Sequence, residues 1–238
     1  MPTLPIARVV TVAYGPLPRA RSLNPRFSPG RPLLMATVDI EWRPDDPLAT
    51  VARLEQRLLH LSPRFARHEC RGLERYHVFA RARPSSPEAS GSGTARPGAD
   101  ASPNDGPDSF EAALALAHLI EHAVIEFQCT ITGERRCSGA TAARRSPAGR
   151  FDLLVESLDP LVGRCCLTLA LTWLTAVAGG HDLDPEPAEV LSAARLAYRR
   201  RGGPILAPDL ARAIRWSEAR AARALTALSA AGYLVERP

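Results

Sequence analysis

The 238-residue chain contains no lysine, so arginine supplies all 30 of its basic side chains. It also lacks a long apolar run. The two longest, Ala112–Ile120 and Leu167–Ala178, are shorter than the roughly 20 residues of a membrane-spanning helix. The first 20 residues have no continuous apolar stretch of the kind found in secretory signals. We therefore expect neither a membrane segment nor a secretory signal.

Cysteine is scarce and unevenly placed. The count is odd, and two of the five cysteines are adjacent, which excludes a simple disulfide framework: Cys70, Cys129, Cys137, Cys165 and Cys166. His68 with Cys70, and Cys129 with Cys137, are possible pairs of metal ligands, but neither pair has C-x-x-C spacing. The sequence predicts free or buried thiols and a reducing, cytoplasmic location.

Apolar residues make up 45% of the chain, which is enough to build an ordinary hydrophobic core. The net charge of +5 is mild. It is compatible with binding to nucleic acid or to an acidic polymer but requires neither.

Hydrophobic periodicity predicts an α+β fold in which helices pack on one face of a sheet. Strands are expected at 7–14, 33–42, 76–82, 127–131 and 151–155. Helices are expected at 48–61, after an N-cap at Ser109, and from Asp159–Pro160 to Ala178. Residues 133–150 are expected to form an arginine-rich loop.

The composition divides the chain into two parts. Residues 1–180 are expected to form the α+β domain, interrupted by an insertion at 83–107 that has no large apolar residue and is expected to be disordered. Residues 186–238 contain helical patterns at 188–200, 208–214 and 217–231, with a short strand at 233–236. This order is typical of a small winged-helix module built around a helix-turn-helix.

The most informative motif is His118-Leu119-Ile120-Glu121-His122, the H-x-x-E-H pattern of the inverted zincins. It lies in a segment that is otherwise apolar. Helical spacing places the two histidines and the glutamate along one flank. Burying them without a partner is costly, so either a divalent metal or a private hydrogen-bond network with arginine is expected.

The sequence of His118–Gln128, HLIEHAVIEFQ, resembles the corresponding helix in the N-terminal domain of cyanophycin synthetases. The segments 32–39, 58–72 and 151–171 also resemble that domain, so the likeness covers roughly residues 20–180. The chain departs from the family at Gly133–Arg136, and it lacks the ATP-grasp and Mur-ligase-like domains. The resemblance therefore does not imply ATP-dependent synthesis of the polymer.

The resemblance implies a zinc-dependent hydrolase, similar to a metallopeptidase, that cuts amide bonds in a cyanophycin-like or related Asp/Arg peptide. His118 and His122 are then the expected zinc ligands, and Glu121 is the general base. The family's acidic residue aligns with Glu156, the expected third ligand, for which Asp152, Asp159 and Glu126 are rivals. Zinc is preferred over manganese or iron only by analogy.

The remaining expected roles concern side chains around this centre. Glu126, one turn beyond His122, is expected to orient that imidazole. Four loop arginines are expected to hold substrate carboxylates: Arg135, Arg136, Arg144 and Arg145.

Two further functions stay open at this point. One is a non-catalytic binding or regulatory module whose winged helix binds DNA or protein, with Arg215, Arg220 and Arg223 as the DNA-contacting residues. The other is a scaffold in which the arginine loop docks a protein partner. Helical C-terminal modules of this kind also pair, so a homodimer is an expectation as well.

Overall fold

The computed structural model describes residues 5–41, 46–67, 107–200 and 205–233. The expected strand at 76–82 lies outside these residues. The expected insertion also lies outside them, except for Pro107. The expected wing strand does as well, except for Tyr233. The model confirms an α+β fold: an antiparallel sheet packed with helices and followed by a helical C-terminal region.

Among the described residues, four strands form the sheet in the order β1-β2-β4-β3, with bounds Ala7–Gly15, Leu33–Ile40, Arg150–Glu156 and Gly139–Ala143. All three pairings are antiparallel, and a bulge interrupts the β1–β2 register between Val9 and Thr11. Side chains alternate between the two faces of a strand. On β4, Phe151, Leu153 and Val155 therefore enter the main core.

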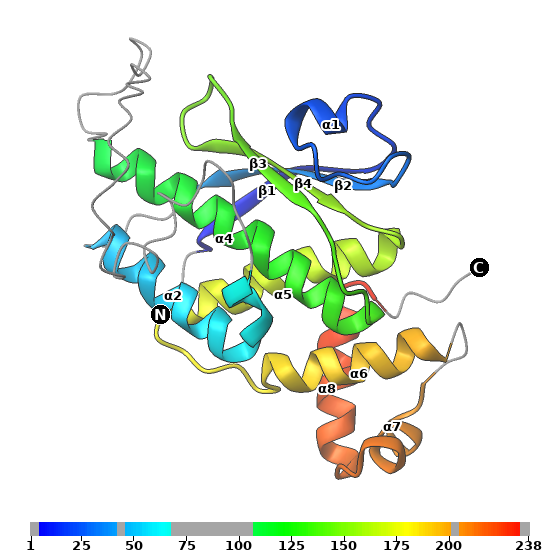
Figure 1. Cartoon of the computed structure of the whole chain (residues 1–238). Helices are drawn as coiled ribbons and strands as arrows, with labels where there is room; N and C mark the ends of the chain where they lie inside the picture. The colour runs from blue at the N-terminus through cyan, green and yellow to red at the C-terminus, as the bar shows by residue number, and fades with distance from the viewer. Residues whose placement is uncertain (1–4, 42–45, 68–106, 201–204, 234–238) are drawn as a thin grey trace.

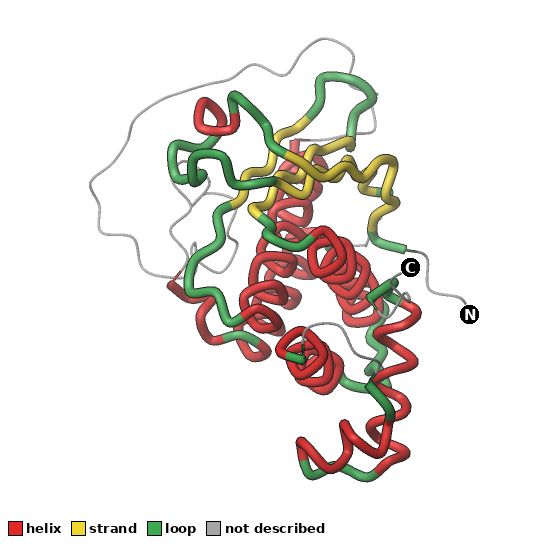
Figure 2. Tube along the Cα trace, turned by 90° about the vertical axis from the view of Figure 1, so that its right-hand side faces the viewer, coloured by secondary structure: helices red, strands yellow, loops and turns green. Residues whose placement is uncertain are grey.

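Helices α4 (Pro107–Thr132) and α5 (Pro160–Ala178) cover that core face of the sheet, and α2 (Pro47–Leu61) packs against both of them. Figures 1 and 2 show the strands as one layer, with these helices beneath it. Asp46 caps α2 and Asp159 caps α5 through their side chains, which satisfies backbone N–H groups that have no partner within the helix. A short 3-10 helix, η1 (Pro63–Arg67), follows α2.

The opposite face of the sheet is covered by the segment between β1 and β2, which includes α1 (Ala20–Leu23). Ala20 and Phe27 from this segment form a second apolar cluster with Leu33 and Leu154 of the sheet. The outer face of β4 is therefore buried at this end as well.

Two elements differ from the sequence prediction. Helix α4 begins at Pro107, two residues before the expected cap at Ser109, and continues to Thr132. Residues 127–131 are therefore helical, and the prediction of a strand there was wrong. Conversely, the expected arginine-rich loop at 133–150 contains β3.

The C-terminal helices are α6 (Pro187–Arg199), α7 (Ala207–Ile214) and α8 (Glu218–Ala230), close to their predicted positions, and Ser217 caps α8 as expected. Helix α6 packs against α4, and α8 packs against α6. Buried residues of all three helices belong to the same apolar cluster as α4 and α5. The helical region is thus continuous with the core of the α+β part.

Helix α5 is long and apolar enough to cross a membrane by length and composition, which its apolar run in the sequence did not indicate. Half of that window is buried inside the protein. Cys165, Cys166 and Leu174 are fully buried on its core-facing side.

Candidate functional site: the buried histidine pair of helix α4

Helix α4 places His118, Glu121 and His122 together in the interior, and each is only 3% exposed. Residues three and four apart in a helix lie on one flank, which is why the motif converges as the sequence predicts. The three residues interrupt a helix whose neighbouring residues, including Ala117, Ile120 and Ala123, are fully buried.

The two imidazoles meet through their Nε2 atoms, which lie 3.0 Å apart. Two imidazoles bound to one tetrahedral zinc ion have their nitrogens about 3.3 Å apart, because each Zn–N bond measures about 2.0–2.1 Å. The same separation also fits an N–H···N hydrogen bond. The pair therefore has the geometry of two metal ligands or of one shared proton.

Glu121 constrains which of these arrangements His118 can adopt. Its Oε2 lies 3.2 Å from His118 Nδ1, on the opposite side of the ring from Nε2. The carboxylate accepts a hydrogen bond from Nδ1–H, and in this tautomer the Nε2 lone pair of His118 points at His122. A carboxylate behind a histidine is a recurrent arrangement around protein-bound metals.

Strand β3 holds Glu121 from the other side. The hydroxyl of Thr141 donates to Glu121 Oε2 at 2.5 Å. A Cβ added at Gly139 would lie 2.9 Å from both Glu121 Cδ and Ile125 Cδ1, and closer still to Glu121 Oε1. A larger residue at this position would therefore force Glu121 and Ile125 to shift. Sequence reasoning missed both residues, because their segment has the composition of a loop.

Aromatic and polar neighbours close the site toward α2. The ring of Phe65 in η1 packs against His122 with 5.1 Å between centroids. One turn beyond His122, the fully buried carboxylate of Glu126 accepts a hydrogen bond from the Ser62 hydroxyl at the end of α2. The described contacts thus connect Glu126 to α2, and its expected role toward His122 stays a prediction.

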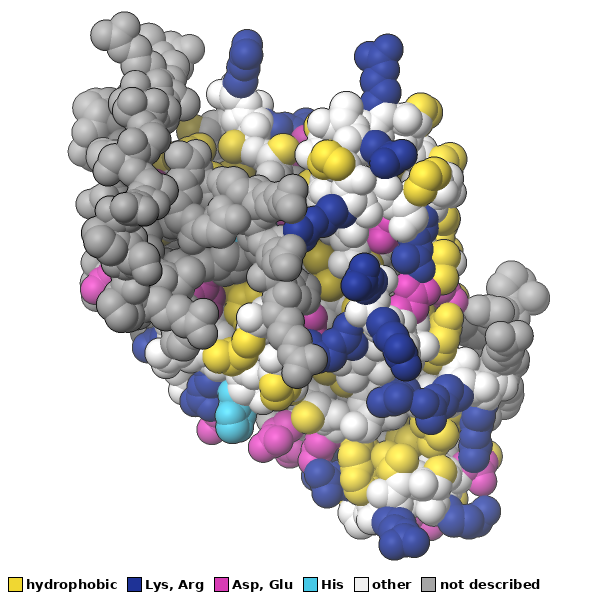
Figure 3. Space-filling model, viewed as in Figure 1, with side chains coloured by type: hydrophobic (Ala, Val, Ile, Leu, Met, Phe, Trp, Pro, Cys, Tyr) yellow, Lys and Arg dark blue, Asp and Glu magenta, His cyan; other side chains and the backbone are white. Residues whose placement is uncertain are grey.

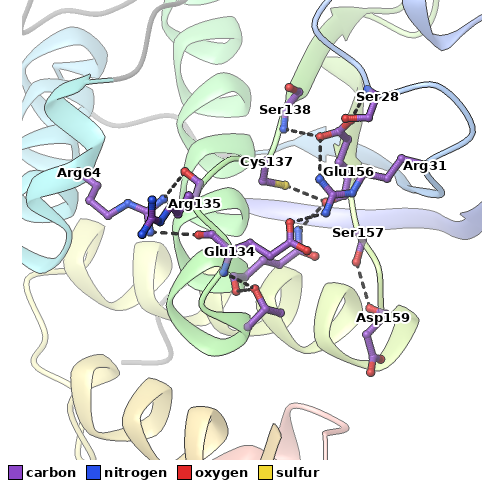
Figure 4. A network of polar contacts seen from close by, with 12 residues as sticks. Ser28, Arg31, Arg64, Glu134, Arg135, Cys137, Ser138, Glu156, Ser157 and Asp159 are labelled. Atoms are coloured by element: carbon purple, nitrogen blue, oxygen red, sulfur yellow. Dashed lines mark hydrogen bonds and ion pairs between the residues drawn. The ribbon is translucent and has the colours of Figure 1, made fainter. Parts of the chain in front are cut away.

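Glu156 lies elsewhere. It projects to the face of β4 opposite Phe151, Leu153 and Val155, and so away from α4. Its carboxylate accepts hydrogen bonds from the backbone N–H groups of Ser28 and Ser138 and lies 3.5 Å from Arg31 Nη1 (Figure 4). The structure does not bring Glu156 to the histidines, and we do not retain it as a ligand.

The carboxylates of two rival ligands are also committed to other groups. Asp152 accepts from the Arg144 guanidinium and the Thr37 hydroxyl. Asp159 caps α5 by accepting from Leu161 N–H and Val162 N–H. Within the described residues, no group of three or more His, Cys, Asp or Glu side chains is arranged to hold a metal.

The described cysteines are free, as expected, and three of the four are buried. Burial raises the pKa of the Cys129 thiol to about 11 and that of Cys165 to about 12. Burial also raises the pKa of Cys137, whose thiol donates to the Glu156 carbonyl oxygen. In the absence of a metal these thiols are protonated at neutral pH. His68 and Cys70 lie outside the described residues.

The four arginines that are expected to bind substrate differ in their surroundings. Arg135 and Arg136 are exposed in the loop after α4, and Arg145 is exposed in the β3–β4 connection. Arg144 instead pairs with Asp152. In Figure 3, arginine side chains gather on the right-hand half of the face shown.

The C-terminal arginines make contacts within the chain. Arg220 pairs with Glu189 at 2.5 Å and lies 4.5 Å from the centroid of the Trp216 ring, while Arg223 pairs with Asp184 at 3.0 Å. Arg215 ends α7 in the left-handed conformation. These ion pairs place the guanidinium groups of Arg220 and Arg223 against α6 and the segment before it.

Comparison of the chain with protein-family models, with curated proteins and with solved structures finds no match. The resemblance to the N-terminal domain of cyanophycin synthetases therefore rests on the sequence segments that suggest it.

Proposed function

We propose that His118 and His122 bind a divalent metal, preferably zinc, and that the α+β part is a metal-dependent amide hydrolase. The observation that carries this proposal is the buried Nε2–Nε2 approach of 3.0 Å, with a carboxylate behind His118. A pair of neutral imidazoles whose lone pairs converge is a typical part of a zinc site.

The surrounding residues fit the chemistry that such a metal would supply. Bound zinc polarises a carbonyl oxygen and activates water for attack on an amide. Glu121 fixes His118, and Phe65 shields the ring of His122 from water. Exposed Arg135 and Arg136 provide bidentate donors for carboxylates, which favours an Asp-containing peptide as the substrate.

Zinc titration of the whole chain tests the metal site. We expect about one zinc per wild-type chain, measured by mass spectrometry of the metal content and by chelator competition, and its loss in H118A and H122A. The matched control is H181A, because His181 is exposed and far along the chain from the motif. An absence of metal after reconstitution with zinc, manganese and iron would leave the histidines as a structural network.

The same assay tests the remaining ligands. E156Q is expected to retain zinc, because its carboxylate faces the other side of the sheet. The same measurement on E126Q, H68A and C70A tests which further side chain binds the metal. A variant that loses the metal while it stays folded identifies the residue it replaces as a ligand.

Glu121→Gln separates two roles of this carboxylate in hydrolysis of synthetic Asp/Arg peptides. If Glu121 is the general base, E121Q retains zinc and loses turnover. If it acts only by fixing His118, E121Q loses affinity for zinc along with turnover. Full activity in E121Q would contradict both roles.

A DNA-binding function is not favoured by any described contact. Arg220 and Arg223 are held in ion pairs within the chain. That alternative and a protein-docking role for the C-terminal helices stay predictions, with a salt-sensitive shift of a DNA probe as the test of the first.

A further inference from the structure

We propose that Thr141 is a positioning residue for the metal site: its hydroxyl fixes the Glu121 carboxylate, which in turn fixes the ring of His118. This inference rests on the proposed function for its effect on metal binding. The positioning itself is a property of the protein without metal.

The contacts form one continuous chain from strand to metal-facing nitrogen. Thr141 Oγ1 donates to Glu121 Oε2, and the same oxygen lies 3.2 Å from His118 Nδ1. On the far side of that ring, His118 Nε2 lies 3.0 Å from His122 Nε2. Rotation of Glu121 away from His118 would release the constraint on which ring nitrogen carries the proton.

Gly139 restricts the same carboxylate sterically. Even a Cβ at position 139 would force the carboxylate of Glu121 to shift from its present position. Glu121 Oε1 therefore lies against the strand, while Oε2 receives the Thr141 hydroxyl. Gly139 and Thr141, which lie on the same side of β3, thus set the position and orientation of the Glu121 carboxylate on α4.

Packing of the hydrophobic core does not by itself require a hydroxyl group at position 141. Glu121 and both histidines are buried among apolar side chains, where a threonine hydroxyl is useful only if it has a polar partner. Valine has almost the same shape as threonine but lacks the hydroxyl. The substitution T141V therefore removes the hydrogen bond and preserves the packing.

Two variants and a matched control test the proposal. T141V is expected to lower zinc affinity by up to about 10-fold, which is less than the roughly 10- to 100-fold typical when the direct partner of a metal-binding histidine is removed, because Thr141 acts through Glu121. T141S retains the hydroxyl and wild-type affinity. T37V is the control, since Thr37 is also a strand threonine whose hydroxyl donates to a carboxylate, Asp152, at 2.8 Å on the opposite face. T37V is expected to leave zinc affinity unchanged.

A readout without metal separates this inference from the proposed function. Nitrogen chemical shifts of the His118 ring, measured by NMR on the metal-free chain, are expected to show Nδ1–H in wild type, T141S and T37V. T141V and E121Q are expected to shift that signal. If wild-type protein binds no zinc, the proposed function fails, and the ring signal still decides the role of Thr141. An unchanged ring signal in T141V would overturn the inference.

Discussion

At the scale of single residues, Glu156 shows how a buried carboxylate is satisfied by the backbone. It is 3% exposed, and its oxygens accept from two N–H groups that belong to the segment between β1 and β2 and to the loop before β3. It therefore connects two segments that are far apart in sequence. Its role is to hold these loops on the outer face of the sheet.

Glu156→Gln is expected to destabilise the fold by about 2–4 kcal/mol, because hydrogen bonds to a charged group contribute roughly 1.5–3 kcal/mol each. The side-chain amide of glutamine turns its own N–H group toward one of the backbone N–H donors, which then loses its acceptor. Urea denaturation measures the loss. D152N is the control, since Asp152 lies on the same face of the same strand but is one-third exposed. An equal effect in both variants would contradict the special role of Glu156.

The sequence contained enough information to predict the histidine pair but was ambiguous for Glu156. Helical spacing alone places His118, Glu121 and His122 on one flank. On β4, the alternation of Phe151, Leu153 and Val155 indicates which face meets the helices. Leu154 obscures that pattern, because the second apolar cluster buries the other face too.

At the scale of elements, β3 and the end of α4 were hard to predict for opposite reasons. Residues 127–131 include β-branched and aromatic side chains, yet packing against α5 and α6 keeps them helical. Residues 139–143 are Gly-Ala-Thr-Ala-Ala, which have little intrinsic strand preference. They form a strand because β4 supplies backbone hydrogen-bond partners for them and because their small side chains allow the strand to lie close to α4.

Asp39 connects three neighbouring strands and gives the sheet a pH-dependent element. Its carboxylate accepts from Arg150 on β4 and from Arg8 on β1. The hydrogen bond to Arg150 is the main cause that lowers the pKa of Asp39 below its ordinary value of 3.8. A carboxyl with a depressed folded pKa stabilises the fold above its unfolded pKa, and loses that effect as the pH falls through the folded value.

We therefore expect D39N to be less stable than wild type at pH 7 by about 1 kcal/mol or less, because the ion pairs are near the surface. The difference should begin to shrink as the pH falls below the ordinary carboxyl pKa of 3.8 and should disappear below the depressed pKa of Asp39. Urea denaturation at both pH values measures it, with D182N as an exposed aspartate control. A difference that grows in acid would have the wrong sign for this explanation.

At the scale of the whole molecule, the described C-terminal helices share the main core of the α+β part and do not form a core of their own. Composition predicts a boundary near Gly179-Gly180, and the helices do begin where that boundary suggests. The packing of α6 on α4 is not visible in the sequence, because an amphipathic helix does not specify which surface its apolar face meets. Val190 and Leu191 are accordingly buried in the same cluster as Phe127.

We expect the two parts to unfold together. Leu228→Ala in α8 removes a fully buried side chain and should cost about 2–5 kcal/mol. In a W42F/W216F background, which leaves Trp173 on α5 as the single tryptophan of the sequence, its fluorescence should report the loss as a lower urea midpoint. S229A, at the exposed neighbouring position, is the control. A Trp173 transition unaffected by L228A would show that the C-terminal helices form a separate unit.

The close approach of Gly139 to Glu121 also has an evolutionary consequence. Substitutions at the two positions are coupled, since a Cβ at 139 would force the carboxylate at 121 to shift. A lineage that kept the glutamate in this position would favour glycine at 139, whereas one that lost or shortened it would be free to drift there. The residue at position 139 is thus a marker, readable in any related sequence, of whether selection still maintains the acid on the helix.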